Sequence, residues 1–276
     1  MINFLKTHSI NRLTWIASPF VVLWFLVSYW SWYAKLNFGS PDHITGYSLF
    51  VVVILLVAFK ARKRTLVLPI GTVLDWKRLH LVLGAISLPL YFQHTGVIWP
   101  QGVYEQWIAF GFYGVSLSAL LGLWLQKFYP QRLTDIGGEV IFERIHLEIA
   151  TIRKQVNDLI LQSAKSHANP ALAKFYVESL AWYFQSPRFI LSHLTGSQRS
   201  HTWINQHITI LQHYLSEAEH SYLIQLEVLA MRKSRLDAHY ALQGALKLWL
   251  FVHVPMAVLL VLLATWHLLL INIYTR

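Results

Sequence analysis

The chain has 276 residues, of which 55% are hydrophobic and only 13% charged, whereas soluble domains carry about 25% charged residues. Part of it is therefore expected in lipid. The net charge of +10 is interpreted as cytoplasmic-loop charge beside acidic headgroups, because no Lys/Arg stripe with interleaved aromatics suggests nucleic acid. Cysteine is absent, which excludes disulfides, Cys-ligated zinc, iron–sulfur clusters and covalently attached c-type haem in this subunit.

Five stretches are apolar enough to form transmembrane helices of roughly 20 residues. The first carries no charge, is too long for a signal peptide and is interpreted as a retained anchor. The second is short enough to be re-entrant, but the charge pattern favours a complete crossing. In chain order the five are Thr14–Ala34, Ile44–Phe59, Leu79–Trp99, Trp107–Leu125 and Leu248–Ile273.

The distribution of Lys and Arg sets the expected orientation of these helices. The link after the second stretch is rich in Lys and Arg and holds a single acidic residue, Asp75, whereas the turn between the third and fourth has only Glu105. The basic link and the N-terminus are therefore predicted to be cytoplasmic and the C-terminus to lie outside. The third and fifth helices then run parallel.

Residues 129–243 are more polar and are predicted to form a cytoplasmic helical, coiled-coil-like insertion. They separate the first four transmembrane helices (residues 1–128) from the fifth (residues 244–276). Heptad spacing predicts one apolar seam from Ile145 to Leu159 and a second from Ile204 to Leu229. Breaks are expected at Asn169-Pro170 and Ser186-Pro187, and the last helix is expected to continue into the fifth span. The sequence thus predicts an all-α membrane protein.

Four histidines fall inside the predicted spans and form two pairs with the same spacing. His80 and His94 lie in the third stretch, and His253 and His267 in the fifth, fourteen residues apart in each case. At about 100° and about 1.5 Å per residue, such a pair shares one helix face and is about 21 Å apart along the axis. On parallel helices, His80 should then be level with His253 toward the cytoplasm, and His94 with His267 toward the outside.

Two facing imidazoles at one depth can ligate a haem iron from both sides, and ionisable residues in spans are usually functional. Interhelical hydrogen bonding alone is the plainer interpretation, which two pairs of identical spacing disfavour. Zinc transport is a further alternative. A zinc ion needs three or four ligands at about 2 Å, and histidines fourteen residues apart cannot share one. The pattern therefore favours an inner haem iron between His80 and His253 and an outer one between His94 and His267.

The H-x13-H pairs on two parallel helices resemble the membrane cytochromes that carry two b haems. These include the cytochrome b of quinol-oxidising complexes and the ferric-reductase-like membrane domain, whose ligands lie on the third and fifth helices. The resemblance covers helices three to five in pattern and implies two non-covalent haem b groups. The chain departs from it by the long insertion and by lacking anything like the flavin- and nicotinamide-binding domain of eukaryotic ferric reductases. It resembles most the bacterial di-haem subunits of larger redox complexes.

Residues near the histidines are candidates for binding the same groups. Gly84, one turn beyond His80, would let a macrocycle lie against the backbone, or else would serve ordinary close helix packing. Lys77, Arg78 and Lys247 lie at the expected cytoplasmic mouth, where they could pair with haem propionates or extend toward headgroups.

An iron with two histidine ligands has no open position for oxygen, so single-electron transfer is the expected function. Two such haems would relay electrons across a bacterial cytoplasmic (inner) membrane, with quinone exchange at one face. A partner redox subunit would carry the c-type haem or iron–sulfur clusters that this chain cannot hold. A stand-alone ferric or quinone reductase and a non-haem membrane scaffold or sensor stay open as alternatives.

Overall fold

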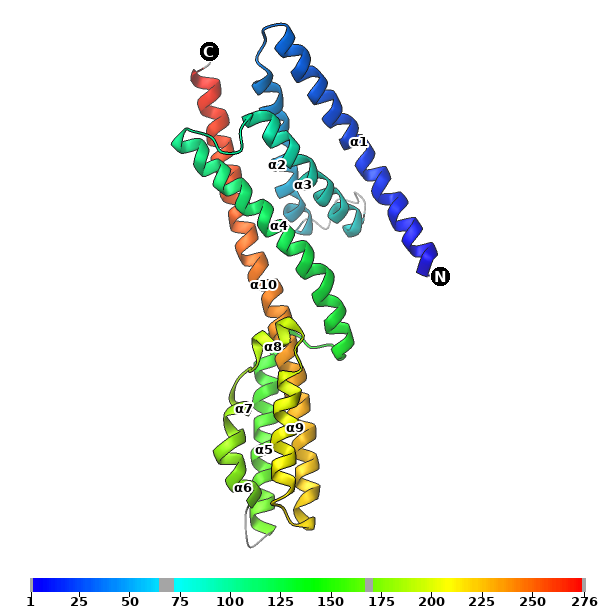
Figure 1. The fold of residues 1–276 in the computed structure, drawn as a ribbon, viewed down its shortest axis with the longest axis vertical. Helices are drawn as coiled ribbons and strands as arrows, with labels where there is room; N and C mark the ends of the chain where they lie inside the picture. Colours follow the sequence, from blue (N-terminus) through cyan, green and yellow to red (C-terminus); the bar gives the residue numbers. More distant parts are fainter. Residues whose placement is uncertain (1, 65–71, 167–170, 275–276) are drawn as a thin grey trace. The chain divides into compact units, whose positions relative to one another are not determined.

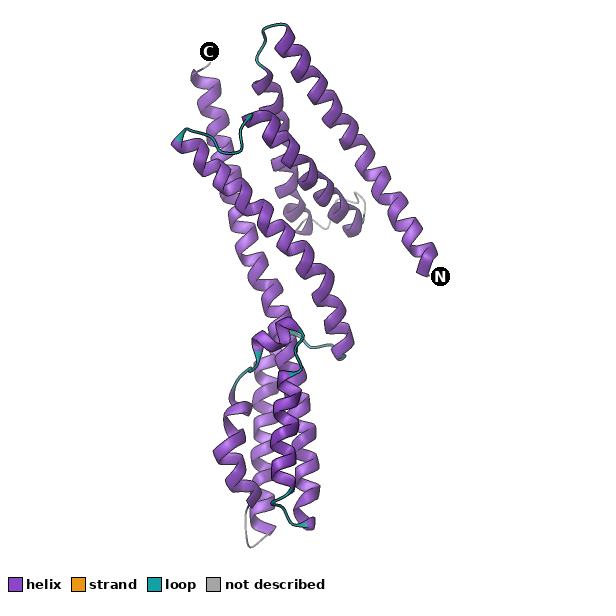
Figure 2. Ribbon diagram, viewed as in Figure 1, coloured by secondary structure: helices purple, strands orange, loops and turns teal. Residues whose placement is uncertain are grey.

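The computed structural model describes residues 2–64, 72–166 and 171–274, and every regular element in these ranges is a helix (Figure 1, Figure 2). The prediction of an all-α chain is confirmed. The longer helices are α1 (Ile2–Leu36), α2 (Pro41–Arg64), α3 (Val73–Thr95), α4 (Val103–Ile136), α5 (Ile145–Ser166), α9 (Arg199–Gln212) and α10 (His220–Tyr274). Shorter ones are α6 (Ala171–Phe175), α7 (Ala181–Gln185) and α8 (Ile190–Thr195).

Within the part of the chain that the structure describes, four helices are long and apolar enough to cross a membrane, and they coincide with four of the five predicted spans. They contain the segments Thr14–Leu36, Pro41–Ala58, Val103–Ile136 and His220–Tyr274. At most 22% of the residues in their most apolar windows are buried inside the protein, so most of their side chains face outward. An outward apolar surface of this extent is stable in lipid rather than in water. The chain is therefore a membrane protein by composition and by structure.

Helix α3, the third predicted span, is not among these four. Polar side chains, including His80, Gln93 and His94, lower its average hydropathy. The helix also ends earlier than the predicted Leu79–Trp99. It stops at Thr95 because Gly96 adopts a left-handed φ of 64° and its N–H bonds to the Phe92 carbonyl. The prediction of a helix that continues to Trp99 is wrong, and His94 lies in the last turn of α3.

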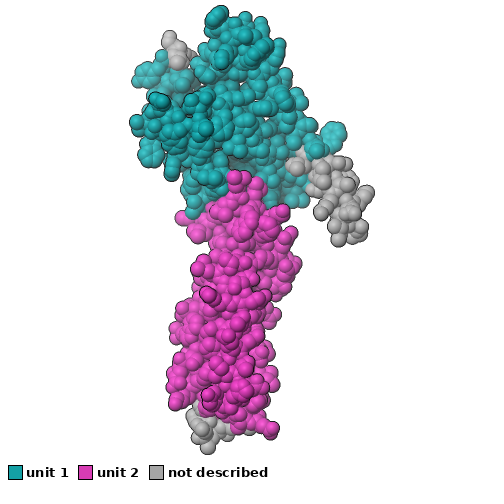
Figure 3. All heavy atoms as spheres, viewed as in Figure 1, with its two compact units in different colours: residues 1–119, 252–276 teal, residues 120–251 magenta. Residues whose placement is uncertain are grey.

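The chain divides into two compact units, residues 1–119 with 252–276 (unit 1) and residues 120–251 (unit 2), coloured separately in Figure 3. Helices α4 and α10 contribute to both. In unit 1, α1, α2 and α3 pack closely against one another. Two tyrosines connect α10 to other helices of unit 1 by hydrogen bonds. Tyr47 Oη of α2 donates to Asn272 Oδ1 at 2.7 Å, and Tyr104 Oη of α4 donates to the Leu263 carbonyl at 2.5 Å.

Unit 2 is a helical bundle around an apolar core, and its first predicted seam is confirmed. The five residues of that seam are all buried along α5: Ile145, Ile149, Ile152, Val156 and Leu159. The second predicted seam, from Ile204 to Leu229, does not lie on one helix. Helix α9 ends at Gln212, and α10 begins at His220 after a capping box formed by Ser216 and Glu219. The prediction of a single second seam is therefore wrong, because its heptad pattern extends across the turn between α9 and α10.

The remaining predictions for this region have mixed outcomes. The expected break at Ser186-Pro187 is present, since α7 ends at Gln185 and α8 begins at Ile190. The break predicted at Asn169-Pro170 lies outside the described residues. The last helix of unit 2 does continue into the fifth span, because α10 runs without interruption from His220 to Tyr274. A single helix therefore carries residues of the unit 2 core and both His253 and His267.

An ion pair is fully buried in unit 2. Lys233 Nζ lies 2.6 Å from Asp237 Oδ2, and both side chains are 0% exposed. The ammonium also donates to the Ser186 carbonyl at 2.8 Å and lies 4.0 Å from the centre of the Tyr183 ring. The hydrogen bonds and the ring compensate the cost of removing a cation from water. The pair fixes how α10 meets the segment that connects α7 and α8.

Removing one member of this pair is expected to cost much more than removing both. Asp237→Ala leaves the Lys233 ammonium buried without its counter-charge, which should destabilise unit 2 by about 3–5 kcal/mol. The double change Lys233→Met with Asp237→Leu should recover most of that loss. As a control, Arg232→Ala removes a partly exposed pair with Glu148 at 3.9 Å and should change stability by less than about 1 kcal/mol. Hydrogen-exchange mass spectrometry on unit 2 peptides measures all three.

The stability of unit 2 is also expected to depend on pH through His193. Burial, aided by nearby His201, Lys233 and Arg132, lowers the pKa of His193 to about 4 from 6.5. Between these values the unfolded chain binds a proton that the folded chain does not, so His193 contributes a slope by which stability falls as pH drops from 6.5 to 4, by up to about 1.4 kcal/mol per pH unit. This slope opposes the contribution of Asp237, because burial raises the pKa of that carboxyl to about 7. His193→Gln should remove this slope in the same exchange measurement. An unchanged slope would assign the pH dependence to other groups.

Candidate haem site

The outer histidine pair of the prediction is brought together in unit 1. The ring centres of His94, on α3, and His267, on α10, are 6.4 Å apart, and the ring planes are inclined by 82°. Tyr104 of α4 stacks on His267, with ring centres 6.1 Å apart and an angle of 21° between the ring planes. Both histidine rings are partly buried, although neither residue belongs to an apolar core cluster. Three helices thus meet at this pair.

The two histidines of the inner pair also lie in the same region of unit 1. His80 of α3 and His253 of α10 lie near enough for their rings to interact electrostatically. The His80 ring also contacts the backbone of Leu56 in α2. His80 and His253 come first on their helices and lie together, and His94 and His267 come second and lie together. Helices α3 and α10 therefore run in the same direction through unit 1. The four histidines therefore form two sites about 21 Å apart along the helices.

The Nδ1 atoms of two of these histidines have hydrogen-bond partners from neighbouring helices. His94 Nδ1 lies 3.1 Å from the carbonyl oxygen of Asp42, in the first turn of α2. His253 Nδ1 lies 3.2 Å from Ser118 Oγ of α4. A metal-ligating histidine commonly donates its second ring N–H to a carbonyl or a similar acceptor, which orients the ring and fixes its tautomer. Nδ1 bound in this way leaves Nε2 for a metal.

Two glycines shape the surroundings of the histidines in different ways. A Cβ built on Gly46 would lie 2.8 Å from His94 Cε1, so the absent side chain is what lets the His94 ring approach α2. A Cβ built on Gly84 would meet no atom within 4 Å. Close helix packing is therefore not the reason for Gly84, and the space over it is free of protein atoms.

Two of the three predicted basic residues have anionic protein partners. Arg78 pairs with Asp75 at 3.1 Å, within the capped first turns of α3, and Lys77 is exposed. Lys247 belongs to unit 2, where its ammonium pairs with Glu143 and lies 4.1 Å from the centre of the Phe142 ring. The structure thus gives Arg78 and Lys247 anionic partners, and their role toward propionates stays a prediction.

Several residues that shape this site were not among those predicted. They are Asp42, through its carbonyl, and Thr45, Gly46, Tyr104 and Ser118. All come from α2 and α4, the helices on which the sequence placed no site residue. A main-chain acceptor has no signature in sequence. A serine or glycine within a span has one, but it cannot be told from residues that serve helix packing.

The geometry of the outer pair fits axial ligation of a haem. With a metal–nitrogen bond of about 2 Å on each side and about 1 Å from nitrogen to ring centre, two axial imidazoles have centres roughly 6 Å apart. The observed 6.4 Å agrees with this value. The extensive backbone packing in the described part of unit 1 is among α1, α2 and α3, whereas α3 and α10 meet through these side chains. The residues present therefore fit the group.

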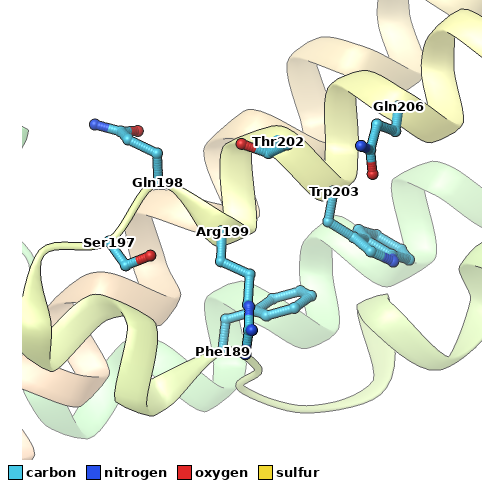
Figure 4. A pocket seen from close by; sticks show the side chains of 7 residues that line it. All are labelled: Phe189, Ser197, Gln198, Arg199, Thr202, Trp203 and Gln206. Atoms are coloured by element: carbon cyan, nitrogen blue, oxygen red, sulfur yellow. The ribbon is translucent and has the colours of Figure 1, made fainter.

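Other possible sites are less informative. Within the described residues, no three His, Asp or Glu side chains gather closely enough to hold a bare metal ion. A cavity of about 550 Å³ lies in unit 2, where Arg199 and Trp203 extend from α9 toward Phe189 (Figure 4). It contains none of the predicted site residues. The chemistry indicated by the sequence is therefore concentrated at the histidine pairs of unit 1.

The contact between Gly46 and His94 can be tested against a matched glycine. Gly46→Ala places a methyl group against a ring held by the Asp42 carbonyl, so it should destabilise unit 1 by about 1–3 kcal/mol. Gly111→Ala, whose Cβ would lie 3.6 Å from Leu260, should be neutral or slightly stabilising, because alanine favours helix. Thermal unfolding of the detergent-solubilised chain compares the two. Equal stability would contradict the tight approach at Gly46.

Comparison with known proteins does not identify the chain. No family model matches it, and neither a curated protein nor a solved structure does. The resemblance to di-haem cytochromes therefore rests on the spacing of the histidines and on the geometry of unit 1.

Proposed function

We propose that the chain is a di-haem b subunit that relays single electrons across a membrane. His80 and His253 would hold the inner iron, and His94 and His267 the outer iron. The observation that carries this proposal is the His94–His267 pair, with ring centres 6.4 Å apart and His94 Nδ1 engaged by the Asp42 carbonyl. A histidine that only packs in a core needs a hydrogen-bond partner such as the Asp42 carbonyl. A histidine that also ligates an iron needs, in addition, a second imidazole at about the observed ring separation.

Iron with two imidazole ligands exchanges single electrons and has no open position for a substrate. The protein contributes the spacing: two sites on the same pair of helices, about 21 Å apart within a hydrocarbon core of about 30 Å. Helices α2 and α4 contribute the groups that orient the ligands. An electron that crosses the bilayer completely works with or against about 2.3 kcal/mol per 100 mV of membrane potential. The arrangement is suited to conducting electrons between a donor and an acceptor.

The partners follow from what the chain lacks and where it lies. With no cysteine, it holds neither iron–sulfur clusters nor covalently bound haem, so a partner subunit carrying one of these completes the electron path. Quinone is the membrane-soluble carrier proposed for the other end. The basic link before α3 supports the proposal that the inner site faces the cytoplasm of a bacterial inner membrane, with the C-terminus outside.

The decisive experiment is a dithionite-reduced minus oxidised visible spectrum of the purified full chain, with haem quantified as the pyridine haemochrome. A b-type spectrum close to two haems per chain is expected. A colourless protein from haem-replete cells would end the proposal and favour a scaffold or sensor. A coloured chain that reduces ferric chelates without any partner would favour a stand-alone reductase.

The assignment of ligands to levels has its own test. His94→Ala and His267→Ala should each remove the outer haem and retain the inner one, so that haem content falls to about one per chain. His80→Ala and His253→Ala should do the reverse. His201→Ala, an exposed histidine of unit 2, is the control and should leave two haems. Loss of both haems from every single variant would contradict the two separate sites.

A further inference from the structure

Ser118 lies in α4, on a helix that supplies no iron ligand, yet its hydroxyl reaches the ring of His253. The Oγ–Nδ1 distance is 3.2 Å. Either atom can donate in such a contact, and the two possibilities have opposite consequences. If the serine donates, Nδ1 is unprotonated and the proton lies on Nε2. If the imidazole donates, Nε2 is left with a free lone pair. Only the second form can bind iron through Nε2.

The other hydroxyl groups in the helices of unit 1 indicate which form is present. Serine and threonine side chains within helices commonly donate to the carbonyl one turn earlier. The structure shows this repeatedly, at distances between 2.7 and 3.0 Å, for Ser28, Ser48, Thr95, Ser116 and Thr265. By the same rule, we expect the Ser118 hydroxyl to donate to the carbonyl one turn earlier in α4. The hydroxyl oxygen then accepts from His253.

We propose that Ser118 is a positioning residue that holds His253 in the Nδ1–H tautomer, so that Nε2 faces the iron site. This inference rests on the proposed haem function and extends it to a residue that binds no iron. The outer site has an equivalent with a different chemical origin. There, His94 Nδ1 lies 3.1 Å from the main-chain carbonyl of Asp42, which can only accept. Both sites thus have an acceptor at Nδ1, one from a side chain and one from the backbone.

The acceptor also changes the ligand electronically. A hydrogen bond from Nδ1–H raises the basicity of the imidazole, which stabilises the oxidised iron more than the reduced iron. Removing the Ser118 hydroxyl should therefore raise the midpoint potential of the inner haem. The outer haem should keep its potential, because its acceptor on α2 is untouched.

The first test needs no haem. The full chain, prepared from haem-deficient cells with ¹⁵N-labelled histidine, reports the tautomer of His253 by NMR, and His253→Gln assigns the signal. The wild type and Ser118→Thr, which keeps a hydroxyl, should show a protonated Nδ1. Ser118→Ala should lose this preference. Ser116→Ala is the matched control, since Ser116 donates to Phe112 of its own helix. An unprotonated Nδ1 in the wild type, or no effect of Ser118→Ala, overturns the inference.

The second test uses the haem-loaded chain and a redox titration followed in the visible spectrum. Ser118→Ala should shift one of the two midpoint potentials upward, and Ser118→Thr and Ser116→Ala should shift neither. Equal shifts of both potentials, or none, would overturn the tuning role. Failure of the haem function is distinguishable from both results. A colourless chain in which Ser118 still sets the tautomer would remove the function and leave the assignment of the tautomer intact.

Discussion

An imidazole inside a bilayer is stable only where its ring nitrogens have partners, because hydrocarbon offers none. In this chain the partners come from neighbouring helices: a carbonyl of α2 for His94 and a hydroxyl of α4 for His253. The rest of unit 1 follows from this requirement. Helix α2 must pack closely on α3, and it does so by a glycine at the point of contact. Helix α4 must lie beside α10 for a short serine side chain to reach the ring.

The same requirement explains why the histidines occur as pairs. His94 and His253 each have Nδ1 bound to a neighbouring helix, and the second ring of the pair is a nearby group of matching chemistry. Hydrogen bonding between the two rings would not need a spacing of fourteen residues repeated on both helices. Two irons on one pair of helices do need it, since each site must recur at a different depth on the same helix face.

Much of this could be predicted from the sequence, for reasons that differ between elements. The four apolar helices and the buried seam of α5 are recognisable because hydrophobic periodicity and length determine them directly. The continuation of α10 into the fifth span was predicted because no break signal lies between them. The early end of α3 was missed, although Gly96 is present in the sequence, since apolar residues continue up to Trp99. The second seam was extended across a turn because heptad spacing persists by chance on both sides of it.

The residues of the candidate site also divide into those that the sequence reveals and those that only the structure reveals. The histidines are visible in sequence because ionisable residues are rare in spans, and their fourteen-residue spacing is unusual. Their partners are not visible, because a carbonyl belongs to every residue and serines and glycines in spans serve many purposes. Only the structure shows that α2 and α4 supply the hydrogen-bond partners of His94 and His253. The ion pair of Lys247 with Glu143 was also not visible in the sequence, because the folding of unit 2 brings together two residues that are far apart along the chain.

The different origins of the two acceptors have an evolutionary consequence. Every amino acid at position 42 supplies a carbonyl, so the group that orients His94 survives any single substitution that preserves the helix. The hydroxyl that orients His253 exists only while position 118 encodes serine or threonine. Selection can therefore adjust one site by a single codon change and leave the other constant. A chain with two nearly identical histidine pairs thereby has one whose orienting group can change by substitution and one whose orienting group cannot.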